Sequence, residues 1–311
     1  KNKKKAFKYF LDAAKLNDPD AFNAVGDCYE NGIGCKKNAE QSYHYYQKSA
    51  DLNNKIGQYH VGLYLMNQSE AKKNPEKALH WLDKAAEQGL KEALRYLQNF
   101  YQEAKHPYLS KKSVSHCQEM AFHYTELLAK EKDVPSLKLA STAYYEGMGP
   151  ARKNYEKAAY YYQLLKDLNE PDGFYGYGVC LLLGQGLKQN IEEAKTYLDL
   201  AANHQHPQAL TKLGDLYRMG MKSGVDVDKA KHYYMEASRL GDLDALVNLG
   251  LMNYKDQLPN ASLSLAYSYM ETAAKKGSYQ AMYWLGIFHQ KGVSVIASFK
   301  EAEKWFEKAI K

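Results

Sequence analysis

Proline is scarce, long apolar runs are missing and the net charge is small in this chain of 311 residues. Only 8 prolines occur, which suits a nearly all-helical chain because proline breaks helix interiors. No apolar run approaches the roughly 18 residues that a membrane-spanning helix needs, and no signal peptide is visible. The formal charge of +6 does not by itself indicate nucleic acid as a partner. These features favour a soluble, helical protein.

Cysteine is also rare, at four residues: Cys28, Cys35, Cys117 and Cys180. Their spacing is irregular and follows no repeat, so a disulfide in every structural unit is excluded. Free, partly buried thiols are the simplest interpretation. Cys28 and Cys35 are close enough in sequence to join a helix end to its following loop, and geometry decides whether they do.

One amphipathic helix pattern recurs along the whole chain. A small residue opens each copy, with an aromatic three residues later and mostly small residues seven and eight positions later. These offsets lie on one face of a helix, where the ring would fill a gap and the small residues would let a neighbouring helix come close. The opening residues are Ala6, Ser42, Ala78, Ala121, Ala158, Ala194, Ala230, Ala266 and Ala302. Most successive copies are 36 residues apart.

A second helix pattern alternates with the first and carries glycine at a fixed place. Its glycines are Gly26, Gly62, Gly178, Gly214, Gly250 and Gly286, and Gln98 and Ser141 take the same place in the two exceptions. Glycine inside a helix costs up to about 1 kcal/mol relative to alanine, so its recurrence predicts close contact between helices. Loops such as NGIGCKKN at 31–38 and LGQGLKQN at 183–190 supply a glycine that ends one helix and an asparagine that caps the next.

The two patterns together predict a repeat of two helices, about 36 residues long. In each repeat the glycine-bearing helix comes first. A single pair cannot bury its apolar face, so such repeats stack into a solenoid. We therefore predict an all-α solenoid forming one array over residues 1–311, with eight first helices and nine second helices. The array begins and ends on a second helix without polar caps, from which we infer a fragment of a longer protein.

These residues resemble the Sel-one-like repeat (SLR) family, a relative of the tetratricopeptide repeats. The resemblance is carried by AFNAVGDCYENGIG at 21–34, ALTKLGDLYRMG at 209–220 and KALHWLDKAAEQG at 77–89. It covers essentially the whole chain, and the units at 93–129 and 245–274 depart most from the pattern. The resemblance implies a right-handed solenoid that acts as a non-enzymatic adaptor or scaffold for other proteins. It implies no catalytic residue and no cofactor.

A partner-binding groove is predicted on the first helices. Positions −3, +1 and +4 relative to the glycine point away from the partner helix and would line a concave groove if the array curves as tetratricopeptide arrays do. Exposed apolar side chains there would mark a site for a partner helix or extended peptide; alternatively, tight curvature buries them against each other. The candidate groove residues are Tyr59, Leu63, Met66, Arg95, Asn99, Lys138, Tyr145, Tyr175, Val179, Arg218, Val247, Leu251, Tyr254, Tyr283 and Ile287.

Basic residues in the loops between first and second helices offer an alternative function. Stacked along one edge of a solenoid, they would suit an acidic partner, phosphoinositide or other anionic lipid headgroups, and would make the protein a membrane-recruited adaptor. The simpler interpretation is that lysines keep loops soluble, and nucleic acid ranks lowest because no base-reading module is present. The basic edge comprises Lys36, Lys37, Lys72, Lys73, Lys111, Lys112, Arg152 and Lys153.

The third unit is seven residues longer than most, and the extra residues fall within 106–115. Added loop length in a repeat array often serves binding, although a surface insertion is also well tolerated. No metal site, phosphate-binding loop or catalytic motif is recognisable. The family resemblance is compatible with two settings: a bacterial secreted or effector protein in host–pathogen interaction, and a lumenal or cytoplasmic adaptor of endoplasmic-reticulum degradation. The Lys-, Asn- and Tyr-rich composition favours the bacterial one.

Overall fold

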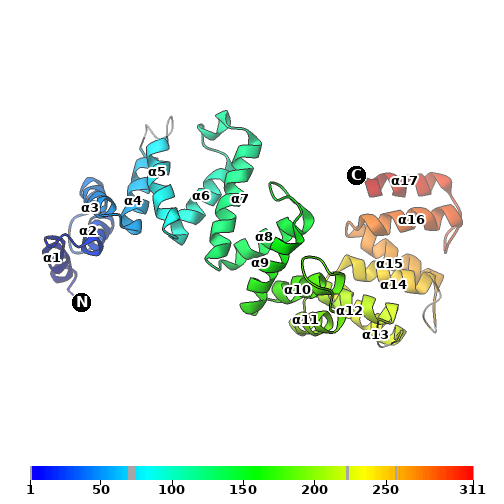
Figure 1. The fold of residues 1–311 in the computed structure, drawn as a ribbon. Coiled ribbons are helices and arrows are strands. Elements are labelled where there is room, and N and C mark those ends of the chain that lie inside the picture. The colour runs from blue at the N-terminus through cyan, green and yellow to red at the C-terminus, as the bar shows by residue number, and fades with distance from the viewer. Residues whose placement is uncertain (1, 69–74, 222–223, 256–257, 259, 311) are drawn as a thin grey trace. The chain divides into compact units, whose positions relative to one another are not determined.

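A computed structural model describes residues 2–68, 75–221, 224–255, 258 and 260–310 (Figure 1). All regular structure over these residues is helical, comprising 17 α-helices and one 3-10 helix. The second helices of the repeats are α1 (Lys3–Ala14), α3 (Ala39–Asp51), α5 (Glu76–Glu87), α7 (Val114–Lys130), α9 (Tyr155–Asp167), α11 (Ile191–Asn203), α13 (Val227–Arg239), α15 (Leu263–Lys275) and α17 (Phe299–Ile310). The first helices are α2 (Pro19–Asn31), α4 (Lys55–Met66), α6 (Lys91–Glu103), α8 (Val134–Glu146), α10 (Pro171–Leu183), α12 (Pro207–Met219), α14 (Leu243–Tyr254) and α16 (Tyr279–Lys291). The 3-10 helix η1 (Leu109–Lys111) lies in the inserted segment.

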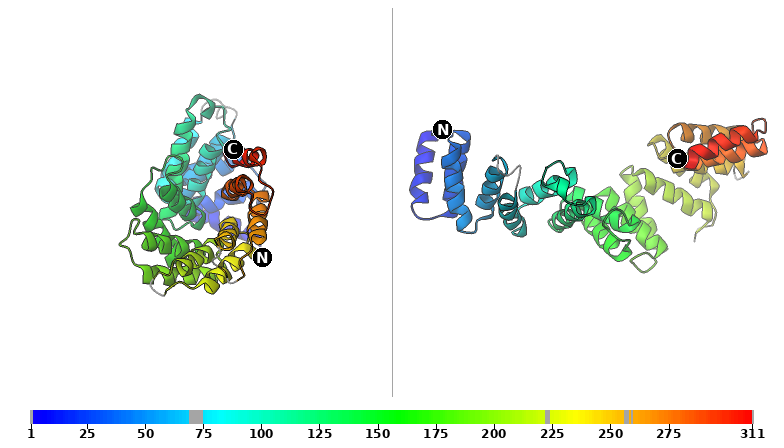
Figure 2. Two further views of the ribbon diagram at one scale, coloured as in Figure 1. Left: turned by 90° about the vertical axis from the view of Figure 1, so that its right-hand side faces the viewer. Right: turned by 90° about the horizontal axis from the view of Figure 1, so that it is seen from above.

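Contacts divide the chain into two compact units, Lys1–Tyr161 (unit 1) and Tyr162–Lys311 (unit 2), which are described separately. In each unit, helices pack chiefly against their neighbours in sequence. Figure 2 shows this for α16 and α17, which lie side by side near the C-terminus. The alternation of first and second helices confirms the predicted all-α solenoid of two-helix repeats.

Helix ends follow the predicted capping residues. Gly32, Gly147 and Gly184 end α2, α8 and α10 in the left-handed conformation, with φ of 68°, 75° and 68°. That conformation suits glycine because it has no Cβ. At the start of α11, the Asn190 side chain accepts a hydrogen bond from the backbone N–H of Glu193 and donates one to its carboxylate. Asn190 thus caps α11, as the loop sequence LGQGLKQN predicts.

The recurrent glycine of the first helix makes room for a large side chain on the second helix. A Cβ on Gly214 would lie 2.6 Å from the ring of Tyr234, and a Cβ on Gly286 would lie 2.4 Å from the ring of Phe306. The predicted close approach of helices is thus confirmed. The residue that fills the space is four positions after the small opening residue, not the aromatic at three. That aromatic instead stacks between helices, as Tyr233 does on the α12 ring Tyr217, with centroids 5.5 Å apart.

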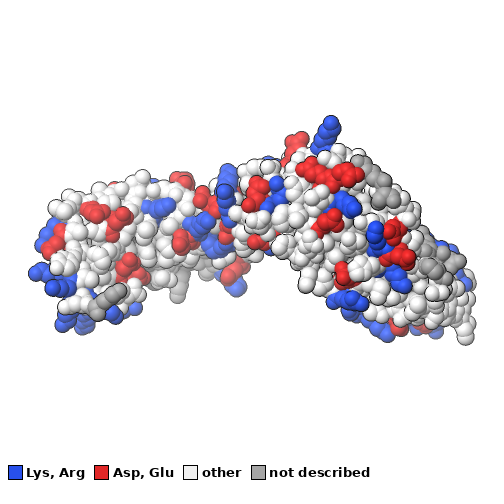
Figure 3. All heavy atoms as spheres, turned by 90° about the horizontal axis from the view of Figure 1, so that it is seen from below, with Lys and Arg blue, Asp and Glu red and all other residues white. Residues whose placement is uncertain are grey.

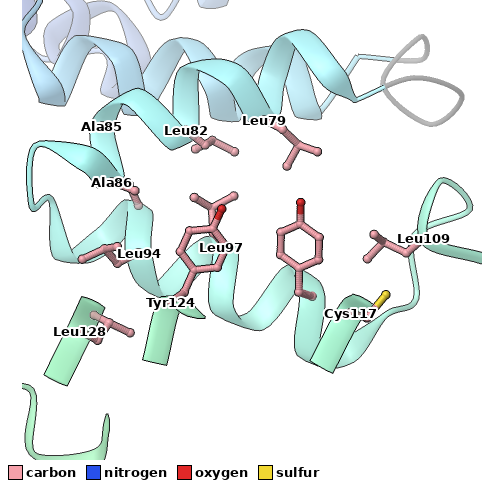
Figure 4. Close-up of a cluster of buried hydrophobic side chains, with 12 residues drawn as sticks. Leu79, Leu82, Ala85, Ala86, Leu94, Leu97, Leu109, Cys117, Tyr124 and Leu128 are labelled. Carbon is pink, nitrogen blue, oxygen red and sulfur yellow. The ribbon is translucent and has the colours of Figure 1, made fainter. Parts of the chain in front are cut away.

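The core continues from one repeat into the next. In unit 1 a buried cluster joins α5, α6 and α7 to η1 (Figure 4). Leu82 and Leu97 are fully buried in it, and Leu109 closes it from the inserted segment. We call this the unit 1 core cluster; its members are Leu79, Leu82, Ala85, Ala86, Ala93, Leu94, Leu97, Tyr101, Leu109, Cys117, Tyr124 and Leu128.

Candidate protein-binding surfaces

Two predicted groove positions at −3 connect one repeat to the next. Asn23 Nδ2 donates a hydrogen bond to Asn54 Oδ1 at 2.9 Å, and Arg95 makes a salt bridge with Asp133. Asn54 and Asp133 are the N-cap residues of α4 and α8. The side chain at −3 therefore holds the start of the next first helix. We call this contact the repeat clasp.

The same contact recurs in unit 2 with different chemistry. The ring of Tyr175 stacks on His206, the N-cap residue of α12, with centroids 4.6 Å apart. His206 also lies 3.5 Å from the carboxylate of Asp172. Position −3 was predicted to face a partner, but at these three sites its side chain contacts the neighbouring repeat.

Burial removes two further residues from the predicted groove. Val247 is 1% exposed and Val179 is 6% exposed, so the expectation that they face solvent is wrong. Val247 belongs to a buried cluster with side chains of α15 and α16, among them Met270 and Leu285, so the neighbouring helices bury it.

The remaining unit 1 groove residues vary in exposure. Tyr59, Leu63 and Met66 are half-buried against the unit 1 core cluster. Asn99 is exposed, and Lys138 and Tyr145 are half-buried. In this part of the chain, most residues of the predicted groove are therefore half-buried.

A contiguous apolar surface persists in unit 2, where α14 and α16 face the same side. We call it the α14–α16 surface; it comprises Leu251, Tyr254, Tyr283, Trp284 and Ile287. The ring of Tyr254 lies 6.0 Å from that of Trp284, which lies 6.1 Å from the ring of Tyr283. Tyr283 is 51% exposed, and the other four are half-buried. Trp284 was not among the predicted residues because it occupies position −2.

A polar network fixes the orientation of Arg218, another predicted groove residue. Tyr234 donates a hydrogen bond to Asp215 Oδ1 at 2.7 Å and accepts one from Arg218 Nε at 3.1 Å. Asn248 of α14 donates to the same Asp215 oxygen at 3.3 Å. Burial and the carboxylate of Asp215 raise the pKa of Tyr234. The hydroxyl therefore stays protonated and joins α12 to α13.

Tyr234→Phe is expected to lower the free energy of unfolding by about 1.5 kcal/mol, since it removes a hydrogen bond to a charged group. Denaturant titration of the purified protein measures this. Tyr160→Phe is the control, because that ring is largely exposed and its loss of a hydroxyl should change little. Equal stability of both variants would show that the network contributes nothing.

The basic edge is only partly described. Lys36, Lys37, Lys112, Arg152 and Lys153 are exposed. Lys72 and Lys73 lie outside the described residues, as does the side chain of Lys111. On the face shown in Figure 3, basic and acidic side chains are interleaved.

A cavity of about 640 Å³ lies beside the inserted segment in unit 1. Its walls come from the end of α6, residues 104–114, α7, α8 and the loop at 148–150. The added length at 106–115 singled out this region in the sequence. The sequence did not indicate that α8 and its following loop also line this cavity. They lie more than 20 residues further along the chain, and only folding brings them to the inserted segment.

Other chemistry is limited over the described part of the chain. Within it, no group of three or more His, Cys, Asp or Glu side chains could hold a metal ion. All four cysteines are free; Cys35 Sγ contacts the carbonyl oxygen of Cys28 at 3.2 Å. No helix over these same residues has the length and apolarity needed to cross a bilayer.

Comparison with known proteins identifies the repeats. The Sel1 repeat model matches residues 1–18, 19–54, 55–90, 137–170, 174–206, 207–242, 243–278 and 280–311. It passes over 91–136, the segment that contains the insertion. No curated protein sequence matches the chain.

A solved structure supports the fold. A Sel1 repeat protein from Oxalobacter formigenes superposes with a TM-score of 0.65 at 20% identity, covering 97% of this chain and 85% of that one. The protective antigen c5321 of uropathogenic Escherichia coli, which has an SLR fold, gives a TM-score of 0.37 at 19% identity, covering 97% and 79%. Since eight matched repeats span most of its length, the chain belongs to the Sel1 repeat family.

Proposed function

We propose that this protein is a non-enzymatic scaffold that binds a partner protein through its first helices, with the α14–α16 surface as the main contact. Sel1 repeat proteins generally mediate protein–protein interactions and form a family of non-catalytic scaffolds. The observation that carries the proposal is the contiguous ring and aliphatic surface formed by two neighbouring repeats.

The chemistry of the α14–α16 surface suits a protein partner. Apolar side chains that stay accessible and gather in one place usually mark an interface. Tyrosine and tryptophan are enriched among the residues that dominate binding energy. Tyr283 packs on Phe306 of α17 at 5.7 Å between centroids, which supports its ring from behind. A partner helix or extended peptide could lay its apolar side chains across these rings.

Tyr283→Glu combined with Ile287→Glu is expected to weaken partner binding at least about tenfold, as loss of a binding hot spot does. Affinity capture from cell lysate with quantitative mass spectrometry would identify the partner, and titration with the purified partner would give the affinity. Circular dichroism would confirm that the variant folds. Leu263→Glu is the matched control, because Leu263 is 48% exposed on α15, a second helix.

Retention of the same partners by the double variant would contradict the proposal. Binding of anionic lipid by the basic edge would be favoured instead if the protein sediments with anionic vesicles at low salt but not at high salt. Salt has this effect because it screens interactions between exposed charges.

A further inference from the structure

We propose that the cavity beside the inserted segment in unit 1 is a second docking site, which takes a partner peptide bearing large apolar side chains flanked by Asp or Glu. We call it the insertion cavity. This inference rests on the proposed protein-binding function but concerns a different surface from α14–α16, so each can fail without the other.

The insertion cavity has the size and floor of a binding pocket. Its volume of about 640 Å³ falls within the roughly 300–1,000 Å³ typical of ligand pockets. Tyr101, Leu109 and Cys117 line it and also belong to the unit 1 core cluster. Figure 4 shows Leu109 and Cys117 close together at the edge of that cluster. The floor is therefore continuous with the buried core.

The inserted segment is anchored in place as one wall of the cavity. Leu109 is 3% exposed, so its side chain ties η1 to the core. Ser110 donates a hydrogen bond to the carbonyl oxygen of Pro107 at 2.6 Å, and the backbone N–H of Tyr108 donates to His106 Nδ1 at 3.2 Å. These contacts fold the extra residues into a turn.

The rim of the cavity favours a macromolecule over a small enclosed ligand. Three of its lining side chains are large, apolar and accessible: Val114 is 74% exposed, Met148 55% and Leu139 48%. They come from α7, the loop after α8 and α8 itself. A small molecule inside the cavity would cover only the inward part of these side chains, whereas a peptide with one side chain in the cavity would cover the rest with its flanking residues.

Charge at the mouth favours an acidic peptide. Lys112 is the one charged side chain among the residues described as lining the cavity. The two segments that border it, 104–113 and 147–154, contain basic residues and no Asp or Glu; Lys105 of the first pairs with Glu103 at 3.1 Å, so the charge preference depends on Lys112 and the second segment. Arg152 and Lys153 are exposed in the second of them. Opposite charges at the rim of an interface speed association and select among partners.

Selection from a random-peptide display library against the whole chain tests this proposal. We expect enriched peptides to combine Leu, Ile, Phe or Trp with Asp or Glu. Affinities of synthetic versions, measured by isothermal titration, should fall at least about tenfold in Leu139→Glu. Leu183→Glu is the matched control, because Leu183 is 53% exposed on α10 in unit 2. Both replaced side chains are accessible, and circular dichroism would verify folding.

Charge swapping tests the acidic part of the motif. Lys112→Glu should weaken the selected peptide several-fold, and the loss should shrink at high salt because the charges are exposed. A peptide whose Asp and Glu are replaced by Lys should bind this variant better than it binds the wild type. Equal affinity of both peptides for both proteins would overturn the charge preference.

Three other results would contradict the proposal that a peptide of this kind binds in the insertion cavity. Peptides that bind Leu139→Glu unchanged but are lost with Tyr283→Glu would place binding on the α14–α16 surface, contradicting this inference and supporting the proposed function. Binding of the dye 8-anilinonaphthalene-1-sulfonate that Leu139→Glu abolishes and no selected peptide displaces would indicate a small-molecule site. A library that yields no specific peptide would overturn this inference, whereas the proposed function is overturned only if the variant with Tyr283→Glu and Ile287→Glu retains its partners in affinity capture.

Discussion

Gly173→Ala is expected to lower the free energy of unfolding by about 3 kcal/mol, at the upper end of overpacking effects. A Cβ at this position of α10 would lie 2.2 Å from the backbone nitrogen of Lys166 and 2.4 Å from the carbonyl carbon of Leu165. Backbone atoms cannot rotate aside as a side chain can, so α9 and α10 would have to separate. The higher helix propensity of alanine offsets at most about 1 kcal/mol of this loss in the free energy of unfolding.

Gly250→Ala provides the matched control for this prediction. It is also inside a first helix, but its Cβ would meet the terminal methyl of Met270 at 2.9 Å, and the nearest backbone atom, the carbonyl oxygen of Ala266, lies at 3.3 Å. That flexible end can move at small cost, so we expect a change within about 1 kcal/mol. Denaturant titrations of both variants measure the difference. Similar midpoints for the two would show that helix separation at Gly173 is inexpensive.

Asp133→Ala is expected to destabilise the protein by a similar amount, about 3 kcal/mol. The Asp133 carboxylate caps α8 by accepting from the backbone N–H and hydroxyl of Ser136, at 3.0 and 2.6 Å, and it pairs with Arg95 in the repeat clasp. Loss of an N-cap costs about 1 kcal/mol, and loss of a hydrogen bond to a charged group costs about 2 kcal/mol. Asp133→Asn keeps the cap but not the charge, so it should lower the free energy of unfolding by about half as much.

The contribution of Asp133 should also depend on pH. Burial acts to raise the pKa of this carboxyl, but the hydrogen bonds from Ser136 and Arg95 outweigh it and hold the pKa below the ordinary 3.8. A lowered folded-state pKa stabilises the protein above 3.8 and loses that effect as pH falls through the folded value. Stability differences between the wild type and Asp133→Ala should therefore be full at pH 7 and shrink below pH 3.8. A difference that stays constant well below pH 3.8 would contradict this account.

Periodicity and capping residues predict most of the fold. The glycines of the first helix and the loop glycines act as expected, because each meets a local backbone or contact requirement that recurs every repeat. The aromatic three positions after the opening residue was expected to fill a gap between helices, but beside Gly214 the ring at four positions, Tyr234, does so in place of Tyr233. Both rings are aromatic, and a 100° difference in direction around the helix decides which one reaches the glycine.

The candidate surfaces were less predictable because they depend on neighbouring repeats. Whether Val247 faces solvent depends on how closely α16 approaches α14, and nothing within its own repeat sets that distance. Arg95 similarly belongs to a clasp whose partner lies 38 residues away. The insertion cavity combines an inserted segment with α8, and sequence spacing does not reveal that the two meet.

The repeat clasp has a consequence for how such arrays can be lengthened. Asn23 and Asn54 are 31 residues apart, whereas Arg95 and Asp133 are 38 apart because the insertion lies between them. The same spatial contact forms in both cases. The seven added residues therefore do not change how one repeat packs on the next. A loop grafted at the matching point of another repeat should then cost little more than its closure entropy, about 0.6 kcal/mol for each doubling of length. New recognition loops could thus be added to this scaffold one repeat at a time without redesigning its helices.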